Sequence, residues 1–186
     1  MKKEIKQNDI RVIKTKKAIY KAFDELLQHN SLDKISVVEL SKRAGINKGT
    51  FYSHYTDIYA LYQEALRLHI DEIISHFESF QYFLEDPDLF AKIFVETSSE
   101  RRKKIDKDPY LGPDNQKWNK GAMVYYGEAI SKVALLKAKL PETDENRMKL
   151  QFIFAGCSAM LYYQDEQYKK AQIDVLSKTI KQLFPR

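Results

Sequence analysis

Apolar side chains recur every three or four residues along most of this 186-residue chain, which is the spacing of one face of an α-helix. One such stripe ends near Leu27, and a longer one follows Asp57. Further helices are predicted after Asp86-Pro87, over about residues 115–140, from Thr143 to about Glu166, and from Lys169 to Phe184. The sequence has no strand-like alternation of useful length. The pattern therefore predicts an all-α protein.

Residues 36–55 predict two short helices joined by a tight turn. Ser36 and Glu39 stand three residues apart, the spacing at which a hydroxyl and a carboxylate satisfy the free amide groups that open a helix. Gly45 suits the left-handed end of that helix, and Asn47 suits the cap of the next one. The second helix carries hydrogen-bonding side chains, which are Lys48, Thr50, Tyr52, Ser53 and His54. The pattern favours a helix-turn-helix whose second helix enters the major groove, and an ordinary helical hairpin is the alternative.

The motif AGINKGTFYSHY, from Ala44 to Tyr55, closely resembles the tetracycline-repressor-like (TetR) family of bacterial regulators. With the apolar spacing before it, the resemblance covers residues 14 to about 66. Asn30 stands where the family usually has glycine, and Ile58 where many members carry a phosphate-contacting lysine. The resemblance implies a three-helix DNA-binding domain over residues 1–60, with a linking helix from about residue 57. It also implies a helical ligand-binding and dimerisation bundle over residues 61–186.

Positive charge is concentrated in the segment that carries the helix-turn-helix. Residues 1–60 hold 12 basic and seven acidic side chains, so the whole formal net charge of +5 lies there. Basic side chains neutralise DNA phosphates, which is where affinity for DNA mostly originates. We expect Lys48 and Thr50 to face the bases, and Gly49 to allow close approach. The predicted DNA-binding residues are Ser36, Val37, Asn47, Lys48, Gly49, Thr50, Tyr52, Ser53 and His54.

The segment FIFAGCSAMLYY, residues 152–163, is apolar on nearly all sides. A helix of that kind must be covered all round, and its own domain covers only part of it. In the resembled family the last two long helices pair with those of a second subunit, which implies a homodimer. The predicted interface residues are Ala155, Ala159, Tyr163, Ile173, Leu176 and Ile180. A deeply buried core helix in a monomer is the alternative interpretation.

Aromatic residues are frequent after residue 80, and an apolar ligand pocket is usually lined by such side chains. Trp118 and Tyr125 lie seven residues apart, so on a continuous helix they would share one face. The predicted ligand-binding residues are Phe94, Trp118, Tyr125 and Phe154. Each of these rings also fits an ordinary hydrophobic core. Nothing in the sequence selects an effector.

Several kinds of function are disfavoured by the composition. A single cysteine, Cys157, excludes an intramolecular disulfide and suits a reducing cytoplasm. No apolar stretch is long enough to span a bilayer. His69 and His76 share a helical face with Glu72, but the two histidines are about 10 Å apart along the axis, too far to close on one ion. The chain lacks a glycine-rich phosphate loop and a paired acid–base signature. We therefore expect a cytoplasmic protein with no catalytic activity, no cofactor, no metal site and no membrane partner.

These observations predict a homodimeric transcriptional regulator, most simply a repressor that binds a pseudo-palindromic operator in double-stranded DNA and is released by a small-molecule effector. A second hypothesis is a helical DNA-binding protein without such an effector, whose C-terminal body binds another protein. A third is a helical scaffold that makes no contact with DNA. Salt-dependent binding to duplex DNA separates the third from the other two.

Overall fold

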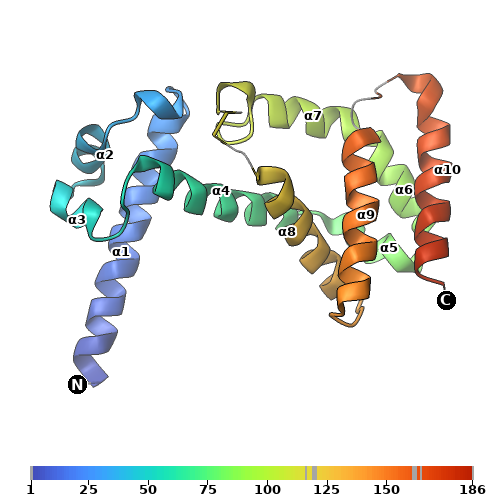
Figure 1. Ribbon diagram of the computed structural model, residues 1–186, viewed down its shortest axis with the longest axis horizontal. Helices are drawn as coiled ribbons and strands as arrows, with labels where there is room; N and C mark the ends of the chain where they lie inside the picture. The colour runs from blue at the N-terminus through green and yellow to red at the C-terminus, as the bar shows by residue number, and fades with distance from the viewer. Residues whose placement is uncertain (1, 116, 119–120, 161–162, 164, 186) are drawn as a thin grey trace. The chain divides into compact units, whose positions relative to one another are not determined.

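The computed structural model describes residues 2–115, 117–118, 121–160, 163 and 165–185 (Figure 1). All regular structure in these residues is helical, which confirms the predicted all-α class. The α-helices are α1 (Lys2–Leu27), α2 (Val37–Ala44), α3 (Lys48–Tyr52), α4 (Ile58–Ser75), α5 (Tyr82–Glu85), α6 (Pro87–Glu96), α7 (Ser98–Asp106), α8 (Ala122–Lys137), α9 (Asp144–Met160) and α10 (Glu166–Leu183). Short 3-10 turns are η1 (Leu32–Lys34), η2 (Glu78–Gln81) and η3 (Pro113–Asn115).

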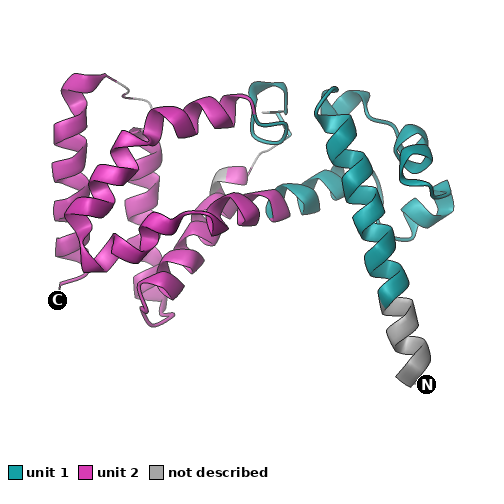
Figure 2. Ribbon diagram, turned by 180° about the vertical axis from the view of Figure 1, so that it is seen from behind, with its two compact units in different colours: residues 1–67, 108–120 teal, residues 68–107, 121–186 magenta. Residues whose placement is uncertain are grey.

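The chain folds into two compact units (Figure 2). Unit 1 comprises residues 1–67 and 108–120, and unit 2 comprises residues 68–107 and 121–186. This division differs from the predicted boundary at residue 60 in two ways. Helix α4 contributes its first turns to unit 1 and the rest to unit 2, and a segment distant in sequence, residues 108–120, joins unit 1.

Unit 1 is built around the long first helix, against which α2 packs, with α3 packed on α2 in turn. Its core consists of fully buried aliphatic and aromatic side chains, among them Ile19, Phe23, Leu26, Leu40, Phe51, Leu61 and Tyr62. The first three of these recur at helical spacing on α1, so one face of that helix supplies a large part of the core.

Polar contacts hold residues 108–120 within unit 1. Asn115 is buried, and its side-chain carbonyl accepts a hydrogen bond from the Leu32 amide at 2.9 Å. Its amide group donates to the Pro109 carbonyl at 2.8 Å. The Tyr110 carbonyl accepts from the Tyr62 hydroxyl at 2.8 Å, while the Tyr110 hydroxyl bonds Asp24. A buried side chain that satisfies two backbone groups fixes its segment, because leaving either group unpaired is costly.

Unit 2 contains α6, α9 and α10 around an aromatic core, with α10 packed along α6. Phe80, Phe83, Phe90 and Phe154 contact one another edge to face or tilted, with ring centroids 5.2–6.1 Å apart. Lys181 on α10 forms a 2.7 Å ion pair with an Asp88 carboxylate oxygen at the start of α6.

Two of the predicted helix boundaries are wrong. The helix expected from about residue 115 begins at Ala122, after Gly121, which has a positive φ of 91°. A residue with positive φ interrupts a right-handed helix, so Trp118 does not share a helix with Tyr125. The helix expected to continue to about Glu166 ends at Met160.

Candidate nucleic-acid interface and ligand cavity

The turn between α2 and α3 has the predicted caps. The Ser36 hydroxyl accepts a hydrogen bond from the Glu39 amide at 3.2 Å and so opens α2. Gly45 adopts the left-handed conformation, with φ 67° and ψ 32°, where a side chain would be strained. The Ile46 amide then donates to the Ser41 carbonyl at 3.0 Å, which closes the end of α2.

Helix α3 is short, and three local contacts fix its orientation. The Asn47 side chain accepts from the Thr50 amide at 2.7 Å, which caps the helix. Phe51 is fully buried and anchors the opposite face in the core of unit 1. The Ser53 hydroxyl donates to the Thr50 carbonyl at 2.7 Å at the end of the helix. A β-carbon on Gly49 would lie 3.2 Å from the capping oxygen of Asn47, so glycine keeps that cap uncrowded.

The nine predicted DNA-binding residues lie together on α2, α3 and the residues that flank them. Lys48, Gly49 and Ser53 are exposed, and the Tyr52 side chain is 56% exposed despite its aromatic ring. Ser36 and Asn47 are exposed at the starts of the two helices, and Val37, Thr50 and His54 are half-buried. Together they form a face with donors, acceptors and one cation, suited to base edges and phosphates.

Val38 is an exposed residue of α2, next to the predicted Val37, that was not among the predicted DNA-binding residues. Its side chain is exposed at the start of α2, although it is large and apolar. An exposed apolar group beside a nucleic-acid surface suits contact with a thymine methyl group or a sugar. The signal was present in the sequence, because position 38 lies off the buried stripe formed by Leu40 and Ala44.

A hydrogen-bonded cluster behind α3 joins three parts of unit 1. The Tyr55 hydroxyl donates to the Tyr20 hydroxyl at 3.0 Å, and the Tyr20 hydroxyl donates to Glu64. Lys16 forms a 2.8 Å ion pair with the same carboxylate. Burial would raise the pKa of Glu64, but the bonds from Lys16 and Tyr20 outweigh it and hold that pKa below its usual value. The cluster thus ties α1 directly to α4, and it ties Tyr55, three residues after the end of α3, to α1.

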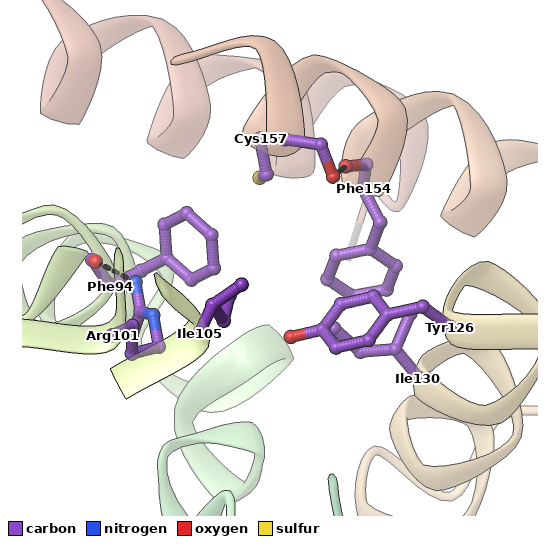
Figure 3. Close-up of a pocket in the computed structure, with 8 residues that line it drawn as sticks. Phe94, Arg101, Ile105, Tyr126, Ile130, Phe154 and Cys157 are labelled. Carbon is purple, nitrogen blue, oxygen red and sulfur yellow. Dashed lines mark hydrogen bonds between the residues drawn. The ribbon is translucent and has the colours of Figure 1, made fainter. Parts of the chain in front are cut away.

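Unit 2 contains a cavity between side chains of α6, α7, α8 and α9 (Figure 3). The residues that line it are Phe94, Arg101, Ile105, Tyr126, Ile130, Phe154, Cys157 and Ser158. Two of the four predicted ligand-binding residues, Phe94 and Phe154, are therefore in its wall.

The other two predicted ligand residues lie elsewhere. Tyr125 follows Val124 on α8 but is not in the cavity wall, where its neighbour Tyr126 stands instead. Trp118 belongs to unit 1, where its ring packs 4.6 Å from that of Tyr59. Sequence reasoning missed Arg101 and Ile105, although their spacing of four residues on an otherwise polar helix placed them on one face.

The predicted dimer-interface residues divide into two groups. Ala155, Ala159 and Tyr163 are exposed, and Ile173 is half-buried. Leu176 and Ile180 lie in the interior of unit 2, where α10 packs on α6, so they are not available to a second subunit. The prediction thus assigned to the interface two residues of α10 that face the interior, because apolar residues such as Val175 also occur on the exposed side of that helix.

In the described residues, no helix combines the length and apolarity that crossing a membrane requires. The same residues contain no group of three or more histidine, cysteine or acidic side chains placed to hold a metal ion.

The fold and the capped recognition helix define an all-helical protein with an amino-terminal helix-turn-helix. The sequence pattern of bacterial regulatory proteins of the tetR family matches residues 19–65. This match makes residues 19–65 similar to the regulatory proteins of that family, and it covers less than half of the chain.

A curated relative is the HTH-type transcriptional regulator YxbF of Bacillus subtilis (strain 168), which is 35% identical over 72 residues. That match covers 38% of this chain and spans only 19% of the relative's length. The shared segment is therefore less than half of this chain and a small part of the relative.

Two solved structures have the same fold over nearly the whole chain. The TetR family repressor AlkX from Dietzia sp. strain DQ12-45-1b superimposes with a TM-score of 0.58 at 16% identity, covering 92% of this chain and 98% of that one. A TetR transcriptional regulator from Rhodococcus sp. RHA1 gives a TM-score of 0.52 at 17% identity, with 96% of each chain covered. These likenesses extend the shared fold to unit 2.

Proposed function

We propose that this protein is a homodimeric transcriptional repressor that binds a pseudo-palindromic operator and leaves it when a small molecule occupies the cavity of unit 2. The observation that carries the proposal is the polar, exposed face of α3, fixed by the Asn47 cap and the buried Phe51. A helix whose backbone is anchored while its polar face is free suits insertion into the major groove.

Lys48 and Thr50 are the residues to which we assign base contacts, because they occupy the first turn of α3. Lys48 donates to guanine O6 or N7 in this assignment, and Gly49 lets the backbone approach the DNA. Tyr52, Ser53 and His54 contact phosphates and neighbouring bases. Phosphate contacts of this kind position the protein, while the base contacts supply the sequence preference.

A second copy of the chain is the partner that we assign to α9. Met148 and Phe152 are 57% and 70% exposed, and they lie on one stripe of α9 with the small residues Ala155 and Ala159, while Tyr163, which is 59% exposed, follows the helix. An apolar stripe with small residues at its centre allows two helices to approach closely. Val175, which is exposed on α10, takes the place of the buried Leu176 in this interface.

The chain path suggests how a ligand in unit 2 affects DNA binding. Helix α7 carries Arg101 and Ile105, helix α8 carries Tyr126, and residues 108–120 are the chain between these two helices. Asn115 and Tyr110 bond that connection to η1, α1 and α4 inside unit 1. A ligand that shifts α7 or α8 therefore also displaces the segment 108–120, which is bonded within the unit that carries α3. This route is additional to any movement of α4.

The test is the selection of bound sequences from random duplex DNA, followed by affinity measurement for wild type and Lys48→Ala. We expect Lys48→Ala to lose about 1–3 kcal/mol at the selected site and to relax preference at one base pair. Lys132→Ala is the matched control, since Lys132 is an exposed lysine on α8 in unit 2. Equal affinity and equal preference in Lys48→Ala and wild type contradict the assignment of α3.

Mutual weakening of effector binding and operator binding distinguishes the repressor from a DNA-binding protein without an effector. An effector that weakens operator binding 100-fold supplies about 2.7 kcal/mol of coupling, and operator DNA must weaken effector binding by the same factor. A small molecule that binds tightly without this mutual effect favours the alternative, in which the C-terminal body binds another protein.

A further inference from the structure

The cavity of unit 2 combines an apolar wall with one cation. Rings of Phe94, Tyr126 and Phe154 and the aliphatic chain of Ile105 form most of its surface, and Arg101 lies at its edge (Figure 3). The space measures about 20 Å³, enough for a group the size of one or two water molecules.

The Arg101 guanidinium has no anionic partner among the described residues. It donates to the Phe94 carbonyl and to the Thr97 hydroxyl, and it lies 4.2 Å from the centroid of the Phe94 ring. These partners are neutral, and they leave further N–H groups uncommitted. Burial lowers the pKa of Arg101, yet a guanidinium stays protonated in proteins. A half-buried charge in an apolar wall is unfavourable unless it is paired with an opposite charge. The binding of an anionic group beside Arg101 is therefore favoured.

The titratable groups that face Arg101 from α8 and α9 do not meet that demand. Burial raises the pKa of the Cys157 thiol to about 12, so it is a neutral thiol at physiological pH. Burial also raises the pKa of Tyr126, although Arg101 opposes the shift, so its phenol keeps its proton. The Tyr126 hydroxyl points into the cavity and is free to donate a hydrogen bond there (Figure 3).

A second, larger space adjoins the first. It measures about 190 Å³ and shares Tyr126, Phe154 and Ser158 with the inner cavity. Its remaining wall consists of Val124, Gly127, Gln151 and Ala155. The two spaces are therefore neighbours at α8 and α9, with a cation in the wall of the smaller one and mostly apolar residues in the wall of the larger one.

We propose that the effector is an organic monocarboxylate with an apolar body, its carboxylate bound by Arg101 and Tyr126 and its body in the wider space beside α9. The planar guanidinium fork matches a carboxylate in two parallel hydrogen bonds. A phosphate monoester is disfavoured, because its second charge has no further cation in the wall of either space. This assignment rests on the proposed function and names the chemical class of its ligand.

Calorimetric titration of the purified full chain, without DNA, tests the assignment. The probes are octanoate and phenylpropionate, each compared with its primary amide, which has the same shape and no charge. We expect each acid to bind at least about tenfold more tightly than its amide, because charge-assisted hydrogen bonds are the stronger kind. Equal affinities for acid and amide, or no binding of either acid at millimolar concentration, overturn the proposal.

Variants at position 101 test whether the acids bind in this cavity. Arg101→Gln is expected to abolish the preference for acid over amide, and Arg101→Lys to retain part of it. Arg102→Gln is the matched control, because Arg102 pairs with Asp106 at 3.2 Å and does not line the cavity. An unchanged preference in Arg101→Gln overturns the proposal, and if that variant does not fold, Arg101→Lys and Tyr126→Phe decide. Since no DNA is present, a failure of operator binding leaves this result intact, and the two proposals fail separately.

Discussion

The two units of this chain present their functional residues in opposite ways. In unit 1 the recognition helix is capped by contacts within a few residues of sequence, such as Asn47 with Thr50. In unit 2 the cavity is assembled from four helices, with Arg101 and Phe154 brought together from positions 53 residues apart in the chain. The first arrangement is visible in a short motif, whereas the second depends on tertiary packing that no short motif contains.

The two units also differ in what covers their apolar side chains. Large side chains of unit 1, such as Phe51 and Tyr62, are fully buried by their own unit. Unit 2 leaves Phe152 and Met148 exposed on α9 and keeps a charged Arg101 in an apolar wall. Unit 1 thus buries its large core side chains, while unit 2 has an exposed apolar stripe on α9 and a half-buried cation that a bound molecule can cover or pair.

The largest expected effect comes from deleting the anchor of the recognition helix. Phe51→Ala removes a fully buried ring and is expected to lower the free energy of unfolding by about 3–5 kcal/mol in urea denaturation. Tyr52→Ala, at the exposed neighbouring position, is the matched control and is expected to change stability little while weakening DNA binding. If both variants unfold at the same urea concentration, Phe51 is not the anchor that the comparison requires.

The exposed face of unit 2 is tested by placing a charge in it. Ala159→Arg is expected to raise the dissociation constant of the dimer at least about 100-fold, about 2.7 kcal/mol, because it leaves an unpaired charge in the seam. Light scattering measures the mass across a dilution series. Leu136→Arg on α8 is the control, because Leu136 is also exposed, at 71%, but lies outside the stripe on α9. A wild type that is monomeric at micromolar concentration removes the proposed interface.

The inclusion of residues 108–120 in unit 1 is tested at Asn115. Asn115→Ala leaves the Leu32 amide without its buried acceptor and is expected to cost about 1–3 kcal/mol of stability. Asp114→Ala, at an exposed neighbour, is expected to be close to neutral. Hydrogen exchange at the Leu32 amide reports the lost bond directly. Unchanged protection of that amide in Asn115→Ala contradicts the attachment of this segment to unit 1.

The sequence was informative where structure depends on neighbours along the chain. The caps at Ser36 and Asn47 and the left-handed Gly45 were predicted and are present, because each involves residues within four positions. Side chains whose role depends on distant segments were missed or misplaced. Arg101 was not identified as a candidate, and Trp118 was placed on a helix that Gly121 interrupts. Leu176 shows the same limit, since a stripe of apolar residues does not say which neighbour covers it.

The smallest expected effect comes from the cluster of Lys16, Tyr20, Tyr55 and Glu64. Hydrogen bonds and an ion pair, rather than apolar contacts, join its members. The pKa of Glu64 lies below its ordinary value of 4.5 in the folded state, so its contribution to stability is present above about pH 4.5 and is lost as the pH falls through the lowered value. The side chains of Lys16 and Glu64 are 34% and 41% exposed, so screening by solvent limits the contribution of this ion pair to less than about 1 kcal/mol. Glu64→Gln is therefore expected to lose slightly less stability than wild type between neutral and acidic pH. Glu128→Gln, at an exposed position on α8 in unit 2, is expected to follow wild type. Parallel curves of unfolding free energy against pH for Glu64→Gln and wild type would mean that the cluster holds its geometry through the tyrosine hydroxyls alone.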